Sequence, residues 1–390
     1  MWIEKLTLTD FRNHAFAELA TLAAPVVLHG PNGAGKTNIL EAVSLLAPGQ
    51  GLRRSAYPDI ARQGGQGGWA VAARVRTGDE TIAIGTGLLP DQTASGRGSR
   101  IVRIDGTPQT GNGVLADYVE MLWLTPTHDG LFTGPAGDRR RFLDRLVLCF
   151  DASHRTRANQ FERAMRQRNR LLELEPRRTA ELAGLERIMS ETGVAIAAAR
   201  RAALDTMRVT IEARRSRSPD SPFPWADIAI DGEIEAALET DAAIDVEDRY
   251  LERLTTMRDR DRAAGRTLAG PHRSDLVVRH GPKQMPARLC STGEQKSLLV
   301  GLVLANAEML TDRATAAGGH EQRNAPILLL DEIAAHLDIN RRAALFSEIV
   351  AIGTQAWMTG TDRSAFESLA EIATFVEVGE DGIRQSGNSL

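Results

Sequence analysis

Apolar positions follow a strand-like pattern through the first 125 residues of the chain. Short apolar runs alternate with polar residues and with glycine-marked turns, around one stretch of helical spacing. Apolar runs and alternation predict strands, whereas a spacing of three to four predicts a helix. The expected elements are strands at 4–10, 24–29, 82–85 and 101–106 (the last ending in an Asp-Gly turn), a helix at 37–46, and loop tips at 64–68 and 96–98.

A helical period replaces this pattern between about residues 139 and 217. Apolar residues there recur three or four positions apart and predict one packed stripe: Leu182, Leu185, Met189, Ile196, Ala199 and Ala203. Pro176 separates a first helix from a longer second one, because proline cannot continue a helix. A single helix over 180–215 would be about 54 Å long, so we expect a short antiparallel helical arm. It is ended by Pro219, Pro222 and Pro224.

After Pro271 the chain returns to alternating strands, loops and helices, with strands expected near Ile327 and Ala356. The length of 390 residues suggests about two domains. We predict three ranges: an N-terminal α/β part with an antiparallel β subdomain over 1–126, a helical insertion over 127–268, and a C-terminal part over 269–390 that completes the first.

Composition narrows the class of protein only slightly. The chain is 42% hydrophobic and 25% charged, with a formal net charge of -4, which is ordinary for a soluble protein. No apolar run is long enough to span a membrane, and the N-terminus has no basic flank followed by an apolar core. Two cysteines, Cys149 and Cys290, are too few for a disulfide framework. A cytoplasmic protein without a membrane partner is therefore expected.

Charge is unevenly distributed in the middle of the chain. Residues 139–217 contain 19 arginines and no lysine against ten acidic residues, whereas 218–250 contain ten acidic residues and one arginine. Such segments are often two solvated helical faces. The alternative is a basic surface that binds a phosphate backbone. The sequence leaves both interpretations open.

The strongest chemical signal is the loop Gly30-Pro31-Asn32-Gly33-Ala34-Gly35-Lys36-Thr37, a G-x-x-x-x-G-K-[ST] motif between an expected strand and an expected helix. Its glycines let backbone N–H groups surround phosphate oxygens, next to the positive end of the helix. Lys36 would contact the outer phosphates and Thr37 would bind Mg²⁺. The chain has only four lysines, so a lysine here indicates a site that the planar guanidinium does not fit. ATP and Mg²⁺ are the expected cofactors.

A second motif is the apolar run 327–330 followed by Asp331 and Glu332. Many buried strands end in an acidic residue, so this pattern is weak alone. Together with the P-loop it predicts a Walker B site. Asp331 would hold Mg²⁺, and Glu332 would orient or deprotonate the attacking water. The expected catalytic residues are therefore Lys36, Asp331 and Glu332.

A third motif, Ser291-Thr292-Gly293-Glu294-Gln295-Lys296, precedes an amphipathic helix expected over 297–310. A Ser and a Gly at a helix start can present a hydroxyl and N–H groups to phosphate, although alone they would indicate a simple helix cap. The order of the motifs favours a phosphate-binding role. A P-loop, a helical insertion, Ser-x-Gly-x-Gln and then a strand ending in Asp-Glu follow one another in ABC-type ATPases. Asp338, in the segment 335–338, takes the D-loop position. The expected strand 356–359 and Thr361 stand where such enzymes have the switch residue, but the usual switch histidine is absent there.

Taken together, these motifs resemble the RecF family along essentially the whole chain. The residues that carry the resemblance are Asp10-Phe11-Arg12-Asn13-His14, the Gly30–Thr37 loop, Gly134-Pro135, Arg139-Arg140-Arg141-Phe142-Leu143-Asp144, the segment 270–276, the Ser291 motif and Leu330-Asp331-Glu332. Two departures stand out. Ser274 stands where the family usually has Asp. The segment Thr292-Gly293-Glu294 departs from the family pattern, in which Gln is common at two of the positions.

The resemblance implies the head of an SMC-type ATPase without the long coiled coil, with a helical lobe and a short coiled-coil-like arm. It implies an ATP-driven, head-to-tail homodimer in which Ser291, Gly293 and Gln295 face the other subunit's P-loop. Arg12 and Asn13 would line the nucleotide pocket. It further implies a weak DNA-dependent ATPase that binds duplex and junction DNA at the nucleoid and helps RecA loading with RecO and RecR.

DNA-contacting residues are less localised by the sequence. The candidates are arginines that cluster or share a helical face: Arg139, Arg140, Arg141, Arg163, Arg166 and Arg170. Aromatic residues make up only 5% of the chain, so a base-stacking platform is not indicated. Recognition of the DNA backbone is the expected mode.

Other P-loop classes fit less well. A transporter ATPase would have its signature closer to the P-loop than the 255 positions between Lys36 and Ser291, and it would carry a switch histidine. A chromosome-organising SMC protein would have arms hundreds of residues long, and a metabolic kinase would lack the Ser291 motif. A phage-defence ABC-like ATPase shares the mechanism but would need an appended nuclease or toxin module.

Overall fold

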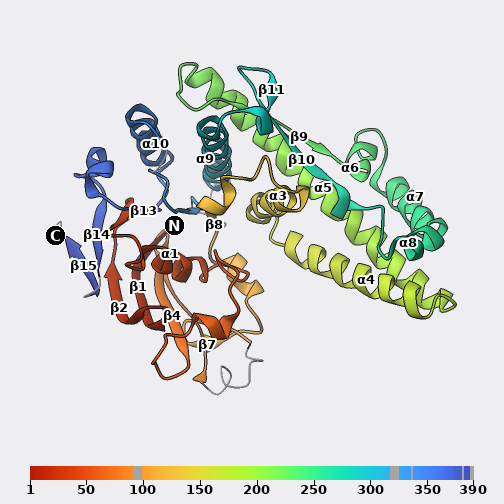
Figure 1. Ribbon diagram of the computed structural model, residues 1–390, viewed down its shortest axis with the longest axis horizontal. Helices are drawn as coiled ribbons and strands as arrows, with labels where there is room; N and C mark the ends of the chain where they lie inside the picture. Colours follow the sequence, from red (N-terminus) through yellow and green to blue (C-terminus); the bar gives the residue numbers. More distant parts are fainter. Residues whose placement is uncertain (91–98, 317–324, 335–336, 380–381, 387–390) are drawn as a thin grey trace. The chain divides into compact units, whose positions relative to one another are not determined.

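The computed structural model describes the chain except residues 91–98, 317–324, 335–336, 380–381 and 387–390 (Figure 1). The chain forms two compact units. The first unit comprises Met1–Asp129, Ser218–Phe223 and Leu299–Leu390, and the second comprises Gly130–Arg217 and Pro224–Leu298. Residues 269–298, which the sequence groups with the C-terminal part, thus fall in the second unit. The three ranges expected from the sequence otherwise remain a prediction.

A six-stranded, largely parallel sheet carries the motifs of the first unit. Its order is β15-β14-β3-β13-β12-β8, and β15 alone is antiparallel to its neighbour. The strands are β3 (Val26–His29), β8 (Met121–Leu124), β12 (Ile327–Leu330), β13 (Ala356–Gly360), β14 (Thr374–Gly379) and β15 (Gly382–Ser386). Every residue of β8 and β12 is buried, as expected of parallel strands covered on both faces.

A second, antiparallel sheet of the first unit has the order β2-β1-β4-β5-β6-β7. Its strands are β1 (Trp2–Phe11), β2 (His14–Ala20), β4 (Trp69–Thr77), β5 (Glu80–Leu88), β6 (Ile101–Ile104) and β7 (Thr107–Pro108). Buried and exposed residues alternate along β4, because one face of this sheet packs on the core. Asp105 and Gly106 both have positive φ, at 48° and 79°, which confirms the expected Asp-Gly hairpin turn.

Helix α1 (Lys36–Ser44) shares one hydrophobic core with both sheets. Its buried Ile39 and Val43 are four residues apart and so lie on one face. They belong to the same cluster as Leu6 of β1, Val71 of β4 and Leu28 of β3. The helix expected over 37–46 is therefore confirmed, and the core holds the loop before it in place.

The pairing of β1 contains an irregularity that the sequence pattern encodes. Ile3 and Leu6 are both buried although three positions separate them, and the register with β4 shifts between Ile3 and Lys5. A β-bulge of this kind leaves backbone groups without a strand partner. Gln355 replaces that partner: its Oε1 accepts from Ile3 N at 2.9 Å, and its Nε2 donates to Ile3 O at 3.1 Å. A buried side-chain amide thus links the two sheets.

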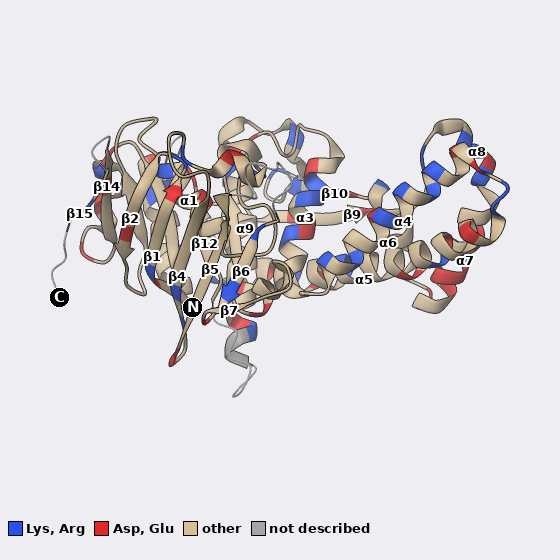
Figure 2. Cartoon of the chain, turned by 90° about the horizontal axis from the view of Figure 1, so that it is seen from below, with Lys and Arg blue, Asp and Glu red and all other residues tan. Residues whose placement is uncertain are grey.

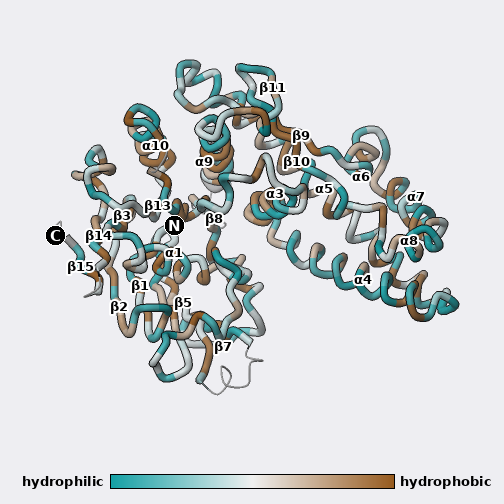
Figure 3. The backbone as a smooth tube through the Cα atoms, viewed as in Figure 1, coloured by the Kyte–Doolittle hydropathy of each residue, from teal (hydrophilic) through white to brown (hydrophobic). Residues whose placement is uncertain are grey.

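The remaining elements of the first unit are mostly helical. They are the short helices η1 (Tyr57–Ile60), η2 (Gly113–Asp117), η3 (Pro126–His128) and η6 (Arg363–Leu369), the helix α10 (Ile339–Ile352) and most of α9 (Thr292–Ala316). Helix α9 differs from expectation, since it begins at Thr292 rather than Ser297. It is also apolar nearly all round rather than amphipathic (Figure 3). Accordingly, almost every side chain from Leu298 to Leu310 is buried.

The second unit is built on helices α3 (Ala136–Phe150), α4 (His154–Leu174) and α5 (Thr179–Arg217). Helices α4 and α5 lie side by side as an antiparallel pair (Figure 1), which confirms the helical arm and the break at Pro176. The second helix is one unbroken element of 39 residues, longer than the short arm expected. The other elements are β9 (Ala226–Asp231), α6 (Glu233–Ala237), α7 (Ala243–Thr256), α8 (Arg258–Ala264), η4 (Pro271–Arg273), β10 (Asp275–His280), β11 (Met285–Pro286) and η5 (Ala287–Leu289).

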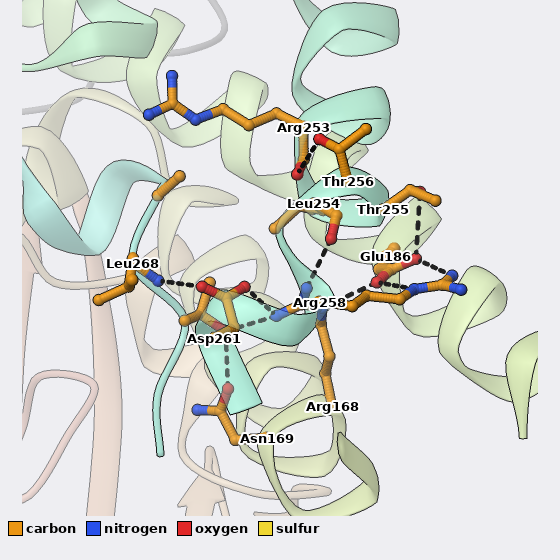
Figure 4. Close-up of polar contacts among 12 residues, drawn as sticks. Arg168, Asn169, Glu186, Arg253, Leu254, Thr255, Thr256, Arg258, Asp261 and Leu268 are labelled. Atoms are coloured by element: carbon orange, nitrogen blue, oxygen red, sulfur yellow. Dashed lines mark hydrogen bonds and ion pairs between the residues drawn. The ribbon is translucent and has the colours of Figure 1, made fainter. Parts of the chain in front are cut away.

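A buried ionic network holds the arm to α7 and α8 (Figure 4). The side chain of Arg168 is fully buried; its Nε donates to Glu186 at 3.0 Å and its Nη1 to Asp261 at 2.7 Å. Its Nη2 donates to Leu254 O at 2.7 Å. Arg258 Nε reaches the same Glu186 carboxylate at 2.9 Å. Each buried charge is thereby paired, as burial requires.

We expect Arg168→Met to lower the free energy of unfolding by about 3–5 kcal/mol, because it leaves the buried Glu186 and Asp261 carboxylates without Arg168. Urea denaturation followed by circular dichroism measures this change. Arg166→Met is the matched control on the same helix, since Arg166 is exposed and pairs with the equally exposed Glu162. Arg166→Met should change the free energy of unfolding by no more than about 0.5 kcal/mol. Equal effects of the two substitutions would refute the role given to the network.

Among the described residues, no helix is long and apolar enough to cross a membrane.

Candidate nucleotide-binding site

The sheet order brings the sequence motifs of the first unit to one edge. The P-loop follows β3 and the acidic pair follows β12, and β13 lies between these two parallel strands. Parallel strands end on the same side, so the residues after β3, β13 and β12 become neighbours. This is the edge at which open α/β sheets bind ligands.

The P-loop adopts backbone conformations that only glycine accepts easily. Gly30, Gly33 and Gly35 have φ of 146°, 84° and 105°. A Cβ on Gly30 would also lie 2.1 Å from the carbonyl oxygen of Val378. Helix α1 begins immediately after Gly35, so its free N–H groups face the loop. The loop therefore fits a phosphate group.

Lys36 is drawn into this loop rather than toward solvent. Its Nζ donates to the carbonyl oxygens of Gly30 at 2.7 Å and Pro31 at 2.8 Å. Burial lowers the pKa of Lys36, while the nearby Glu332 and Asp331 carboxylates act in the opposite direction. The ammonium group is thus held at the mouth of the loop, facing the two acidic residues of the Walker B motif.

Asp331 is the centre of a compact group of oxygens. Its Oδ1 accepts hydrogen bonds from Thr37 Oγ1 at 3.0 Å and from Thr359 Oγ1 at 2.8 Å. The backbone N–H of Glu332 donates to Thr359 Oγ1 at 2.7 Å. Glu332 itself is exposed and has a φ of 51°, a left-handed conformation that is uncommon outside glycine. Three chain segments thus meet within hydrogen-bonding distance.

The chemistry of this group suits Mg²⁺. Mg²⁺ prefers oxygen ligands and takes only one or two carboxylates from the protein, the remainder coming from phosphates and water. Thr37 and Asp331 offer one hydroxyl and one carboxylate side by side. Within the described part of the chain there is no group of three or more His, Cys, Asp or Glu residues that could hold a metal ion.

Asn13 lies directly against the P-loop, at the tip of the β1–β2 hairpin. Its Nδ2 donates to Ala34 O at 3.0 Å, and its Oδ1 accepts from Asn38 Nδ2 at 2.7 Å. A Cβ on Gly35 would lie 2.4 Å from Asn13 Nδ2. The hairpin turn at Asn13 therefore also supports the P-loop.

Arg12 points to helix α1. Its Nε and Nη2 donate to the two carboxylate oxygens of the buried Glu41 at 2.8 and 2.6 Å, and its Nη1 donates to Asp59 O at 2.8 Å. This is the paired geometry that a guanidinium forms with a carboxylate. The structure thus gives Arg12 a role in holding α1, and its contact with nucleotide remains a prediction.

Two residues of this region were not predicted as site residues from the sequence. Thr359 is fully buried near the end of β13 and links Asp331 to Glu332; its signal was its place in the strand that leads to the expected switch position. Arg53 is half exposed and donates to Asn38 Oδ1 at 2.7 Å. Its signal was weaker, since it lies in a glycine-rich loop without a motif.

In the second unit, the Ser291 motif forms the first turn of α9. Ser291 N donates to Glu294 Oε2 at 3.0 Å, and Glu294 N donates to Ser291 Oγ at 3.4 Å. This reciprocal pair is a capping box. Hydrogen bonds from the Lys283 ammonium and the Ser291 backbone lower the pKa of Glu294 to about 2. Gln295 is buried and donates to Cys290 O at 2.9 Å.

Ser291 is therefore a helix cap, and it is also exposed to solvent, so its hydroxyl is accessible to a ligand. The trans role predicted for Ser291, Gly293 and Gln295 stays a prediction. Asp338 is likewise a helix cap, since its side chain accepts from Arg341 N at the start of α10. Residues 335–336 of the predicted D-loop lie outside the described residues.

The arginines predicted to contact DNA fall into two groups. Arg139 is bound to Asp275 through its Nε and Nη2, both at 2.7 Å, and Arg140 Nη1 donates to Ser274 O at 2.7 Å. Both guanidinium groups are thus bound by residues of the second unit, so they are less available to bind DNA phosphates than exposed arginines are. The other four are exposed: Arg141, Arg163, Arg166 and Arg170. Basic residues are spread along α4 (Figure 2).

The fold and this site define an ATPase head of the ABC type. The family model of the RecF/RecN/SMC N terminal domain matches residues 2–381. A protein of Mesorhizobium japonicum described as "DNA replication and repair protein RecF" is 52% identical over 96% of this chain and 96% of its own length. One of Rhizobium rhizogenes with the same description is 49% identical over 99% of both chains. The chain belongs to the RecF family.

Solved structures agree on the fold. A structure described as the recombination mediator protein RecF with ATP in the RecFOR pathway has a TM-score of 0.83 at 20% identity, covering 99% of this chain and 98% of that one. An SMC head bound to the C-winged helix domain of ScpA has a TM-score of 0.56 at 14% identity, covering 100% and 98%. The expected SMC-like head with a helical lobe is thereby confirmed.

Proposed function

We propose that this protein is an ATP-dependent DNA-binding protein of replication and recombinational gap repair. The observation that carries the proposal is the convergence of Lys36, Thr37, Asp331 and Glu332 at one sheet edge. Whole-length relatives at about half identity, described as RecF replication and repair proteins, support the repair role. The protein would act in the cytoplasm at the nucleoid, with RecR, RecO and RecA as partners of the pathway.

The chemistry would be slow ATP hydrolysis. The P-loop glycines and the start of α1 would bind the phosphates, Lys36 would neutralise their developing charge, and Glu332 would orient the water. Thr37 and Asp331 would hold Mg²⁺, which when bound would supply positive charge that polarises the phosphate. Asn13 would keep the loop in its binding conformation. DNA would raise this weak turnover.

A head-to-tail homodimer completes the proposal. Ser291 and Gly293 lie at the exposed or half-exposed start of α9, where a hydroxyl, N–H groups and the helix dipole can meet a phosphate of the partner's ATP. ATP bound between two subunits stabilises the dimer alone, so dimerisation would depend on ATP. Hydrolysis would then release the dimer and its DNA.

DNA would contact the exposed arginines Arg141, Arg163, Arg166 and Arg170. The last three follow one another at spacings of three and four on α4, so they share a helical face. Such a face suits the phosphate backbone of duplex or junction DNA rather than base edges. Binding through several phosphates would weaken steeply with salt.

We expect Ser291→Arg to leave ATP binding by the monomer intact and to weaken ATP-dependent dimerisation by roughly 100-fold or more, because it brings a second cation against the partner's P-loop lysine. Light scattering with ATP, with ADP and without nucleotide measures the dimer. Glu294→Gln is the control, since it weakens the same helix cap while keeping the Ser291 hydroxyl. A normal dimer in the Ser291 variant would overturn the trans arrangement.

A further inference from the structure

Thr359 occupies a position between the two acidic residues of the Walker B motif. It is the fourth residue of β13, the strand that separates β3 from β12, and its side chain is 0% exposed. Its neighbours in the strand, Ala356 to Met358, are apolar and pack in the core. A hydroxyl buried at such a place must be hydrogen-bonded, and its partners show what it does.

The direction of each hydrogen bond follows from the groups involved. An ionised carboxylate only accepts, so the single hydroxyl proton of Thr359 is donated to Asp331 Oδ1, at 2.8 Å. A backbone N–H only donates, so Glu332 N gives its proton to the Thr359 oxygen, at 2.7 Å. The Thr359 hydroxyl is therefore both a hydrogen-bond donor and a hydrogen-bond acceptor.

These two bonds act on different parts of the site. The bond to Asp331 fixes the carboxylate that also accepts from Thr37 Oγ1, so the two oxygens suited to Mg²⁺ keep their relative orientation. The bond from Glu332 N fixes the peptide between Asp331 and Glu332. That peptide leads into the left-handed conformation of Glu332, with a φ of 51°. Such a conformation persists only when the surroundings hold it.

We propose that Thr359 is a positioning residue for ATP hydrolysis, whose hydroxyl couples the metal-binding carboxylate of Asp331 to the backbone that aims Glu332 at the attacking water. The inference rests on the proposed ATPase function of this site. Thr359 contacts neither nucleotide nor water in this role and acts through its two neighbours. Partners of metal ligands typically change metal affinity or activity 10–100-fold when they are removed.

The test is Thr359→Val, which removes the hydroxyl and keeps the branched shape. We expect kcat for ATP to fall roughly 10–100-fold, with KM changed by less than about threefold. Electron paramagnetic resonance of Mn²⁺ added to the ADP-bound protein gives a readout independent of turnover. We expect the Mn²⁺ affinity to fall about 10-fold. Thr359→Ser should restore both values.

Thr354→Val is the matched control. Thr354 is also buried, and its hydroxyl donates to Pro326 O at the opposite ends of the same two strands. It should lower the melting temperature about as much as Thr359→Val while leaving kcat and Mn²⁺ affinity unchanged. Equal losses in the two valine variants would reduce Thr359 to a packing residue and overturn the proposal. Wild-type values for Thr359→Val, or no restoration by serine, would overturn it as well.

If Thr359→Val does not fold, Thr359→Ala is measured against Thr354→Ala by the same criteria. If the wild type itself shows no ATP turnover, the proposed function fails. In that case the Mn²⁺ affinities still decide whether Thr359 orients Asp331.

Discussion

Glu332→Gln is expected to bind ATP with nearly wild-type affinity and to hydrolyse it about 10²–10⁴-fold more slowly, the range typical of a lost general base. The amide keeps the size of the side chain and keeps the backbone N–H that donates to Thr359. It loses the negative charge that we propose orients and deprotonates water. Single-turnover hydrolysis measured by rapid quench separates this chemical step from binding and release.

The same substitution should prolong the ATP-bound dimer, because we propose that hydrolysis releases it. Light scattering after dilution of the ATP complex measures its lifetime. Glu371→Gln is the matched control, since Glu371 is an exposed glutamate of the same unit, and it should change neither rate. Unchanged turnover in the Glu332 variant would remove Glu332 from the catalytic role.

Lys36→Met is expected to weaken ATP binding by about 2–5 kcal/mol, the loss typical of truncating one partner of a buried charge pair. The ammonium group is buried against the loop carbonyls of Gly30 and Pro31, and it is the only cation within the P-loop itself. Methionine keeps the length of the side chain but cannot neutralise phosphate. Isothermal titration with ATP and Mg²⁺ measures the change directly.

Lys5→Met provides the control, because Lys5 lies half-exposed on β1, where it pairs with Glu18 and not with the P-loop. Its affinity for ATP should equal that of the wild type. Tight ATP binding by the Lys36 variant would contradict the assignment of the P-loop as the phosphate site.

Much of the site was predictable because its motifs are local. Neighbouring residues alone were enough to predict three features: the Gly30–Thr37 loop, the strand 327–330 and the break at Pro176. The order of the motifs along the chain then identified the class of ATPase. The Ser291 motif alone would have indicated only a helix cap. In the structure Ser291 is indeed a cap, which shows why that motif cannot be interpreted in isolation.

What the sequence left open depends on contacts between distant residues. Thr359 acquires its role only because β13 is inserted between β3 and β12, an order that no local pattern encodes. The same holds for Arg139, which is bound to Asp275, 136 positions away. The start of α9 was placed five residues late, because Thr292 and Gly293 are poor helix formers that the capping box brings into the helix.

We propose that ATP controls dimerisation and thereby DNA binding. The most direct measurement is a titration of a gapped DNA duplex, read by fluorescence anisotropy, with ATP, with ADP and without nucleotide at several salt concentrations. We predict that ATP alone gives tight binding, at protein concentrations where light scattering shows a dimer, and that this binding weakens steeply with salt. Equal DNA affinity in all three nucleotide states, from a protein that binds ATP and stays monomeric, would contradict the account.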